Sequence, residues 1–396
     1  MVPNGWERKP LEKVAEIRTG VAKGKKGLKD PIEVPYLRVA NVQDGHIDLS
    51  EVKTIKIERH QLERYSLQVG DVLMTEGGDF DKLGRGDVWQ GQITPCLNQN
   101  HVFAVRPNNQ ILLPYFLAAL SGSNYGKTYF LSCAKRSTNL ASINSTQLKE
   151  FPVLLPPLPE QRKIAKILST WDKAITTTEK LIETSKQQKK ALMQQLLTGK
   201  KRLVNPETRK EFVGEWESSV LNRTCKISKG KQLNRSTLNA TGQYPVINGG
   251  ITPSGYTDSF NTVKNTITIS EGGNSCGYID FQKKDFWCGG HCYNLKDVTI
   301  DLKYLYQYLK FSERKIMSLR VGSGLPNIQK KAIENVPILY PSEHEQRKIA
   351  SILTAADKEI EILTAKLAHF KQEKKALMQQ LLTGKRRVKI EEMEVA

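Results

Sequence analysis

The sequence predicts an α+β protein in which two globular blocks are separated by two long helices that pair in a coiled coil. A segment at residues 155–204 recurs at residues 340–390 after a shift of 185, and about 25 of the 41 positions from Glu160 to Lys200 are identical. Each copy has a helical heptad pattern, and each follows a block of alternating apolar and polar residues. A period this long is too large for a solenoid, so it indicates a pseudo-two-fold internal repeat of two half-molecules.

The first globular block is predicted to comprise residues 1–154, and the second, together with its linker, residues 205–339. The blocks begin alike, because the sequence around Trp6 recurs around Trp216. Residues 205–215 are charged and contain a proline, which is typical of a linker. The beginning of the first block is therefore repeated in the second block, whereas the interiors of the two blocks diverge.

Both blocks contain a strand-like run that ends in Glu-Gly-Gly, at residues 72–78 and 267–273. Alternation of Val, Leu and Ile with polar residues predicts half-buried strands, and the glycine-rich stretches between them predict turns. A short helix is expected later in each block, near residues 113–120 and 302–311. We therefore expect both blocks to be α+β domains with a curved sheet.

Each repeated segment, at residues 155–204 and 340–390, is predicted to be one long helix, and residues 391–396 form an acidic tail. Apolar residues recur at alternating steps of four and three, which keeps one apolar seam on one face as in coiled coils. Gly199 and Gly384 lie where a C-terminal cap glycine belongs. The predicted seam consists of Ile164, Leu168, Trp171, Ile175, Ile182, Ile349, Leu353, Ile360, Leu363, Leu367 and Phe370.

An apolar seam is unstable in water, and each copy supplies a matching partner, so the simplest arrangement pairs the two helices with each other. Two separate amphipathic helices, each packed on its own block, are the alternative. At about 1.5 Å per residue, roughly 40 residues make a rod of about 60 Å. Ser342 and Glu345 fit a capping box at the start of the second helix.

The chain carries 60 Lys and Arg against 41 Asp and Glu, a formal net charge of +19. Such an excess favours a polyanionic partner, most often a nucleic acid, over a merely soluble basic protein. There is no apolar run long enough to span a membrane and no signal-peptide core after Met1, so a cytoplasmic location is expected. The six cysteines are then expected to be reduced thiols.

The motifs of a self-sufficient enzyme are not found in the sequence. A phosphate-binding loop needs G-x-x-x-x-G-K-[ST], and residues 122–128 are one residue short of it, which favours an ordinary turn. Asn205 and Pro206 are followed by Glu207, which does not fit the Asn/Asp-Pro-Pro-aromatic loop of adenine methyltransferases. No catalytic residue is therefore assigned.

One group of residues has the composition of a zinc site. Cys276, Cys288, Cys292 and His291 offer four ligands, but the adjacency of His291 and Cys292 makes simultaneous tetrahedral ligation awkward. Thiols packed in a sheet core are the favoured interpretation, and no metal-binding residue is assigned.

Four sequence motifs identify a known family. They are the proline-rich lead into the residues from Glu160 to Ala165, its repeat from Glu345 to Ala350, the ending LMQQLLTGK of each long segment, and the opening of each half from its tryptophan to a glycine. In these motifs the chain resembles the specificity subunit of type I DNA restriction-modification enzymes, and the resemblance covers nearly the whole chain. It implies that the divergent blocks are target-recognition domains, each recognising one half of a split double-stranded DNA sequence. The helices would then pair as an antiparallel coiled coil that spaces the domains and docks two modification subunits.

The resemblance also implies that catalysis belongs to partner subunits. Modification subunits would carry the adenine methyltransferase, and restriction subunits would translocate and cut DNA. S-adenosylmethionine, ATP and Mg are expected in those partners, and no cofactor is expected in this chain. Two alternatives stay open: a recognition subunit for a fused nuclease and methyltransferase, and a structural coiled-coil adaptor without sequence-specific DNA reading.

Individual DNA contacts are expected at turns from which a polar or basic side chain reaches a groove. Arg and Lys recognise guanine, Asn and Gln recognise adenine, and either cation binds phosphate. A solvated surface residue is the alternative at each position, and Trp6 and Trp216 are expected to be core anchors rather than stacking platforms. The predicted DNA-binding residues are Lys23, Lys25, Lys26, Arg85, Gln99, Asn100, Arg136, Asn139, Lys229, Lys231, Arg235, Asn274, Lys283, Lys284, Arg320 and Asn327.

Overall fold

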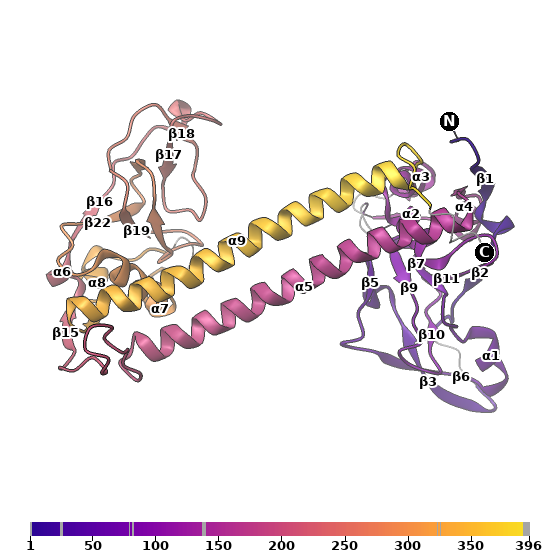
Figure 1. Ribbon diagram of the computed structural model, residues 1–396, viewed down its shortest axis with the longest axis horizontal. Coiled ribbons are helices and arrows are strands. Elements are labelled where there is room, and N and C mark those ends of the chain that lie inside the picture. Colours follow the sequence, from indigo (N-terminus) through magenta and orange to yellow (C-terminus); the bar gives the residue numbers. More distant parts are fainter. Residues whose placement is uncertain are drawn as a thin grey trace. The chain divides into compact units, whose positions relative to one another are not determined.

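The computed structural model divides into two compact units, each containing one globular domain and one end of each long helix (Figure 1). Unit 1 comprises Met1–Glu179 and Lys366–Ala396, and unit 2 comprises Lys180–Ala365. The structure describes residues 2–23, 27–78, 80, 83–136, 140–322, 324 and 326–390, with the backbone alone at Arg235. Within those ranges, no helix is both long and apolar enough to cross a lipid bilayer.

The domain of unit 1 is built on a four-stranded sheet in the order β2-β11-β7-β9. A second sheet has the order β10-β3-β6, and β1 pairs antiparallel with β14, which joins the beginning of the domain to its end. A small sheet of β12, β13 and β8 lies beyond β7. The elements are β1 (Glu7–Pro10), β2 (Ala15–Thr19), β3 (Pro31–Leu37), β4 (Val42–Gln43), β5 (His46–Ile47), β6 (Lys53–Glu58), α1 (Leu62–Tyr65), β7 (Val72–Thr75), β8 (Gly77–Gly78), β9 (Gly86–Val88), β10 (Leu97–Asn98), β11 (Val102–Pro107), α2 (Pro114–Gly122), α3 (Asn124–Cys133), β12 (Lys135–Arg136), β13 (Ala141–Ser142), α4 (Ser145–Lys149) and β14 (Pro152–Leu155).

The domain of unit 2 repeats this topology. Its four-stranded sheet has the order β16-β22-β19-β20, its three-stranded sheet the order β18-β17-β21, and β15 pairs with β23 as β1 does with β14. The repeat that the sequence predicts is therefore present in the strand order as well. The elements are β15 (Glu217–Val220), α6 (Leu221–Thr224), β16 (Lys226–Lys229), β17 (Tyr244–Ile247), β18 (Tyr256–Thr257), β19 (Thr266–Ser270), β20 (Ile279–Gln282), β21 (Trp287–Cys288), β22 (Cys292–Lys296), α7 (Leu302–Met317), α8 (Lys330–Glu334) and β23 (Pro337–Tyr340).

The central strands are more deeply buried than alternation alone predicts. Every residue of β7 and of β19 is buried. In β7, Met74 belongs to the core cluster that includes Phe116 of α2, whereas Leu73 belongs to a second cluster with Trp89 and Leu37. Apolar side chains therefore cover both faces of this strand, which is why it does not behave as a half-buried one.

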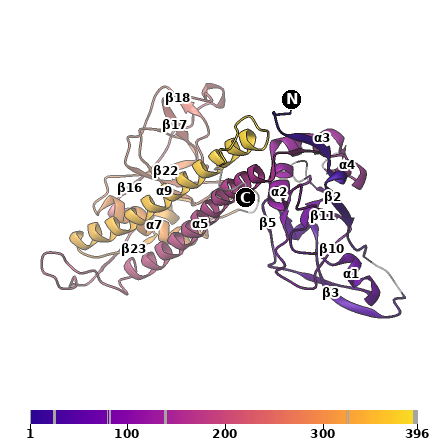
Figure 2. The same cartoon turned by 45° about the vertical axis from the view of Figure 1, so that its right-hand side comes forward.

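The two long helices are α5 (Leu158–Leu196) and α9 (Glu343–Leu381), each 39 residues long. Each is followed by a glycine with positive φ, Gly199 at 70° and Gly384 at 66°, as the predicted C-terminal caps require. In unit 1, the first part of α5 lies beside the last part of α9 (Figures 1 and 2). There Asp172 binds Lys374 and Glu179 binds Lys371, so α9 numbers fall as α5 numbers rise and the pairing is antiparallel.

The same interhelical ion pair occurs once in each unit. In unit 2, Lys189 Nζ lies 2.5 Å from Asp357 Oδ1. Lys189 and Asp357 are the repeat counterparts of Lys374 and Asp172, which form the pair in unit 1. The aspartate comes from α5 in unit 1 and from α9 in unit 2, as expected for a two-fold repeat. The two pairs therefore favour one register of the coiled coil.

The predicted seam residues face the partner helix to different degrees. In unit 1, the Trp171 and Phe370 rings meet edge to face with centroids 5.6 Å apart, and Ile164 and Leu168 are buried. In unit 2, Ile182, Ile349 and Leu353 are buried. The other seam residues, which are half-buried, are Ile175, Ile360, Leu363 and Leu367.

At each end of the coiled coil, an arginine that follows one long helix forms an ion pair with a glutamate of the other long helix. We call these two contacts the helix-end ion pairs. In unit 2, Arg202 donates from Nε at 2.9 Å and from Nη2 at 2.7 Å to the buried carboxylate of Glu345. In unit 1, Arg387 makes the same contact with Glu160, to which Trp6 Nε1 also donates at 3.3 Å. Glu345, expected to belong to a capping box, thus has a tertiary partner.

Candidate nucleic-acid interface

In unit 1, Glu76 lies opposite His101, one residue beyond the paired residues of strands β7 and β11. Thr75 pairs with Val102 in this antiparallel ladder, so the next residues along are Glu76 and His101. The Glu76 backbone N–H donates to the His101 carbonyl at 3.1 Å, and Glu76 Oε2 lies 2.6 Å from His101 Nδ1. The glutamate side chain is 29% exposed and the histidine 56%, so the imidazole is the more accessible of the two.

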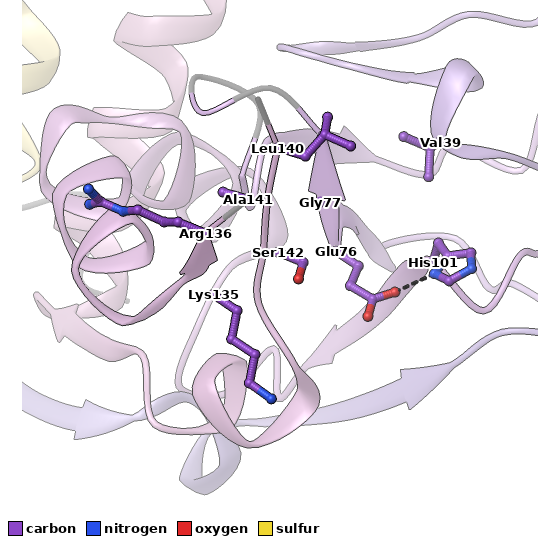
Figure 3. Close-up of a pocket in the computed structure, with 10 residues that line it drawn as sticks. Val39, Glu76, Gly77, His101, Lys135, Arg136, Leu140, Ala141 and Ser142 are labelled. Carbon is purple, nitrogen blue, oxygen red and sulfur yellow. Dashed lines mark hydrogen bonds and ion pairs between the residues drawn. The ribbon is translucent and has the colours of Figure 1, made fainter. Parts of the chain in front are cut away.

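This pair borders a surface depression of about 510 Å³ (Figure 3). The depression is lined in addition by Lys135 of β12, by Ser142 of β13 and by the glycines of β8, which carry no side chains. The Ile143 N–H donates to the Glu76 carbonyl at 2.8 Å, which fixes the segment after β13 against the end of β7. Three chain segments therefore converge at the Glu76–His101 pair.

The same arrangement recurs in unit 2. Ser270 of β19 pairs with Cys292 of β22, which places Glu271 opposite His291. The Glu271 N–H donates to the His291 carbonyl at 2.9 Å, and Glu271 Oε2 lies 3.5 Å from His291 Nδ1. The Ile328 N–H donates to the Glu271 carbonyl at 2.8 Å. Here the glutamate side chain is 14% exposed and the histidine 64%.

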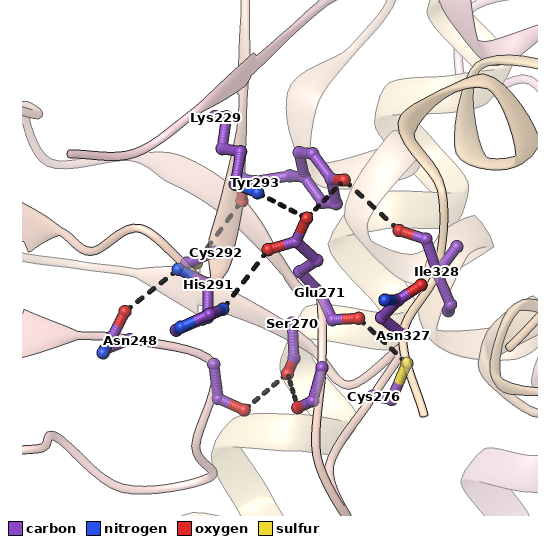
Figure 4. Close-up of polar contacts among 12 residues, drawn as sticks. Lys229, Asn248, Ser270, Glu271, Cys276, His291, Cys292, Tyr293, Asn327 and Ile328 are labelled. Carbon is purple, nitrogen blue, oxygen red and sulfur yellow. Dashed lines mark hydrogen bonds and ion pairs between the residues drawn. The ribbon is translucent and has the colours of Figure 1, made fainter. Parts of the chain in front are cut away.

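Glu271 has more partners than its counterpart in unit 1 (Figure 4). Lys229 Nζ lies 2.6 Å from Glu271 Oε1, and the Tyr293 hydroxyl donates to the same oxygen at 3.0 Å. Burial and this hydrogen bond raise the pKa of Tyr293, so its hydroxyl remains a donor. Cys276 Sγ donates to the Glu271 carbonyl at 3.0 Å. Glu271 is thus fixed by partners on several elements while His291 stays accessible.

The predicted DNA-binding residues of unit 1 have different environments. Lys23 is exposed, with Nζ 5.7 Å from the centroid of the Tyr36 ring. Arg85 is half-buried and donates to Gln43 Oε1 at 3.2 Å, while exposed Arg136 donates to the Leu131 carbonyl at 2.7 Å. The half-buried residues Gln99 and Asn100 directly precede His101. Lys25, Lys26 and Asn139 lie outside the described residues.

In unit 2, two of the predicted residues lie beside Glu271. Lys229 binds its carboxylate, and Asn327 pairs with Gly272 in an isolated bridge. Lys283 is directed to helix α9, where its Nζ lies 3.4 Å from Glu361 Oε2. The exposed residues are Lys231, Asn274, Lys284 and Arg320, and Arg235 belongs to a short 3-10 helix (Arg235–Thr237).

The residues with enzyme-like or zinc-like spacing have structural partners. Gly126 lies at the junction of α2 and α3, where a Cβ would come 2.2 Å from the Ser121 carbonyl oxygen, and Lys127 forms an ion pair with Asp44. The Cys288 and Cys292 thiols are buried in the sheet. Among the described residues, no group of three or more His, Cys, Asp or Glu side chains is arranged to hold a metal ion.

Comparison with known proteins identifies the family. The model of the type I restriction modification DNA specificity domain matches residues 3–186 and, a second time, residues 214–372. The two matches agree with the duplicated domain topology and the duplicated Glu–His pair. This chain belongs to the type I restriction-modification DNA specificity family, and it has two copies of the specificity domain.

Individual relatives match this chain over most of its length. A Methanocaldococcus jannaschii protein with the provisional name of type I restriction enzyme MjaX specificity subunit is 31% identical over 407 residues, covering 98% of this chain and 95% of the relative. The MjaVIII specificity subunit of the same organism is 28% identical, covering 90% and 86%. The crystal structure of an S subunit from M. genitalium shares the fold, with a TM-score of 0.66 at 16% identity, over 96% of this chain and 97% of that one.

Proposed function

We propose that this chain is the non-catalytic DNA-recognition subunit of a type I restriction-modification complex and that each domain recognises one half of a bipartite target. The observation that carries this proposal is the duplication of the domain frame around divergent interiors. Both domains keep the strand order, the terminal pairing and the Glu–His pair. Two domains with one scaffold and different surfaces suit two different half-sites, and the net charge of +19 suits DNA.

We assign the recognition domains to residues 1–154 and 205–339, and we assign the spacing of the half-sites to α5 and α9. The repeated interhelical ion pairs of Asp172 with Lys374 and of Asp357 with Lys189 support a fixed register. A helix of 39 residues measures about 58 Å at 1.5 Å per residue. That length is somewhat under two turns of B-DNA, at about 34–36 Å per turn.

The long helices also suit the docking of two copies of one partner. Exposed positions on α5 recur unchanged on α9, for example Gln187 as Gln372 and Lys190 as Lys375. An identical exposed surface that occurs twice matches two modification subunits. In this proposal those subunits use S-adenosylmethionine to methylate adenine, and restriction subunits use ATP and Mg to translocate and cut DNA.

A change in helix length tests the spacing role. Seven residues inserted after Thr178, with seven more after Leu363, preserve the heptad pattern and lengthen each helix by about 10 Å. Because DNA advances about 3.4 Å per base pair, the unread spacer of the methylated motif should lengthen by about three base pairs. DNA twist over these three base pairs also rotates the distant half-site by roughly 100°. If the domains do not follow this rotation, the spacer should lengthen by fewer base pairs.

The readout is the adenine methylation motif of the assembled modification complex, determined by single-molecule sequencing. A four-residue insertion in α5 alone is the control, because it breaks the register and should weaken assembly with the modification subunits. An unchanged spacer together with full activity in the seven-residue variant would show that another element sets the separation.

A further inference from the structure

The two domains diverge in most of their interiors, yet both keep a glutamate followed by two glycines and a histidine opposite it. The strand ladders enforce this pairing, since Glu76 meets His101 and Glu271 meets His291 one residue beyond the paired strands. The loops between these residues differ in length in the two halves. The pair is thus kept at one structural position although the sequence separation changes.

The Glu–His pair is common to two domains that recognise different bases. It therefore suits contact with a part of DNA that is the same in every sequence. That part is the sugar-phosphate backbone, whose contacts position a protein without specifying bases. The exposed fractions agree with this assignment, because each glutamate side chain is more buried than its histidine. The glutamate therefore acts within the domain, and the histidine is the more accessible member of each pair.

The charges around each pair favour an anion. In unit 1, Lys135 lines the same depression as His101. Its counterpart in the repeat, 185 residues later, is Arg320, which is exposed. Arg320 directly precedes Val321, which pairs with Asn327, and Asn327 pairs in turn with Gly272, the residue after Glu271.

One glycine beside the pair of unit 2 leaves room for a close approach by the DNA backbone, whereas Gly77 in unit 1 lies against β13, where a Cβ would come 2.8 Å from the Ala141 carbonyl oxygen. Gly77 and Gly78 line the depression in unit 1, and Gly273, with a φ of 75°, has open space where a side chain would be. A glycine at such a position lacks the steric barrier of a Cβ. The same Glu-Gly-Gly sequence thus supplies both the carboxylate that holds the histidine and residues without side chains beside it.

We propose that the Glu76–His101 pair and the Glu271–His291 pair form one phosphate-binding site in each domain, where the histidine Nε2–H donates to a DNA phosphodiester oxygen while the glutamate holds Nδ1–H. Lys135 and Arg320 supply the adjacent positive charge. Glu76 and Glu271 are positioning residues, because they act on DNA through the histidine. This assignment rests on the proposed DNA-recognition function and adds to it a contact that is the same in both half-sites.

The test measures DNA binding by the assembled modification complex with His101→Ala, His291→Ala and the double variant. The probes are two fluorescein-labelled duplexes of 40 base pairs, one carrying the methylation motif of the wild-type complex and one with that motif scrambled. Each single substitution should weaken binding to both duplexes by the same factor, about tenfold, as expected for a lost hydrogen bond to a charged group. The double variant should show the product of the two factors, since each site acts in its own domain.

Two further measurements separate phosphate binding from a structural role. The magnitude of the slope of log affinity against log salt should decrease by about 0.9 for each lost phosphate contact, whereas a loss of affinity without a lost phosphate contact would leave this magnitude unchanged. His101→Arg should restore affinity and slope, because arginine also donates to phosphate. His60→Ala is the matched control, since His60 is an exposed histidine of the same domain, and its affinity should equal that of the wild type.

Three results would overturn the phosphate site. They are unchanged affinity for both duplexes, a loss confined to the motif duplex, or a relaxed base preference at one position, which would mean that the histidine reads a base. Failure of the proposed function has a different signature: the wild-type complex would then bind the motif duplex no better than the scrambled one.

Discussion

The helix-end ion pair of unit 2 makes a stability prediction that can be derived from its geometry. Arg202 forms two hydrogen bonds, at 2.9 and 2.7 Å, with the carboxylate of Glu345, whose side chain is 0% exposed. Arg202→Ala leaves that carboxylate buried without its cation. Breaking a buried pair in this way costs about 3–5 kcal/mol. Because the Arg202 side chain is 21% exposed, water can reach the vacated position, so we expect the lower end, about 3 kcal/mol.

The assay is native-state hydrogen exchange, because a chain with two units does not give a single unfolding free energy. At about 1.4 kcal/mol per factor of ten, the amides at the start of α9, residues 346–353, should exchange roughly 100-fold faster in Arg202→Ala. Lys201→Ala is the matched control, because Lys201 is an exposed cation beside Arg202, and exchange in that variant should match the wild type.

A compensating double variant provides a second check. Replacing both members of a buried ion pair by apolar residues of similar volume is often neutral, so Arg202→Met with Glu345→Leu should recover most of the lost protection. Unchanged exchange in Arg202→Ala, or equal acceleration in Lys201→Ala, would refute the assignment of this stability to the ion pair.

Three other outcomes are expected. DNA affinity should fall by roughly 1,000-fold or more between 50 and 200 mM salt if six or more phosphates are contacted, and a flat salt dependence would contradict an electrostatic contribution. Replacing Lys25 and Lys26 by Ala should weaken binding to all sequences alike, whereas a shifted methylation motif would mean that these residues read bases. Burial raises the pKa of both Cys96 and Cys225 to about 12, so their thiols should stay protonated and unalkylated by iodoacetamide at pH 8 in the folded chain, as peptide mass spectrometry can measure. Labelling of these two thiols before unfolding would show that the sheet cores open.

The long helices could be predicted from sequence because their signals are local. The heptad pattern and the cap glycines at Gly199 and Gly384 need no tertiary information, and the structure has a helix of 39 residues before each glycine. The pairing of the two helices followed from the apolar seam that recurs in both copies. Burial of both faces of β7 could not be predicted in this way, because it depends on which distant side chains, such as Phe116 and Trp89, cover it.

Only part of the candidate site could be predicted from the sequence. Glu-Gly-Gly is visible in both halves, but its pairing with His101 and His291 depends on strand register, which the sequence does not give. Arg202 and Arg387 belong to basic tails and suggest solvated charges, yet each binds a buried glutamate far away in the chain. The available signal was that Arg and Glu both recur at the same shift of 185 residues.

The most direct test of the account is an exchange of one recognition domain. Residues 1–154 are replaced by the corresponding domain of a relative with a different target, and the adenine methylation motif of the assembled modification complex is determined by single-molecule sequencing. We predict that one half of the bipartite motif changes to that of the relative, while the other half and the spacer stay as in the parent. A change in both halves, or in neither, would contradict the assignment of one half-site to each domain.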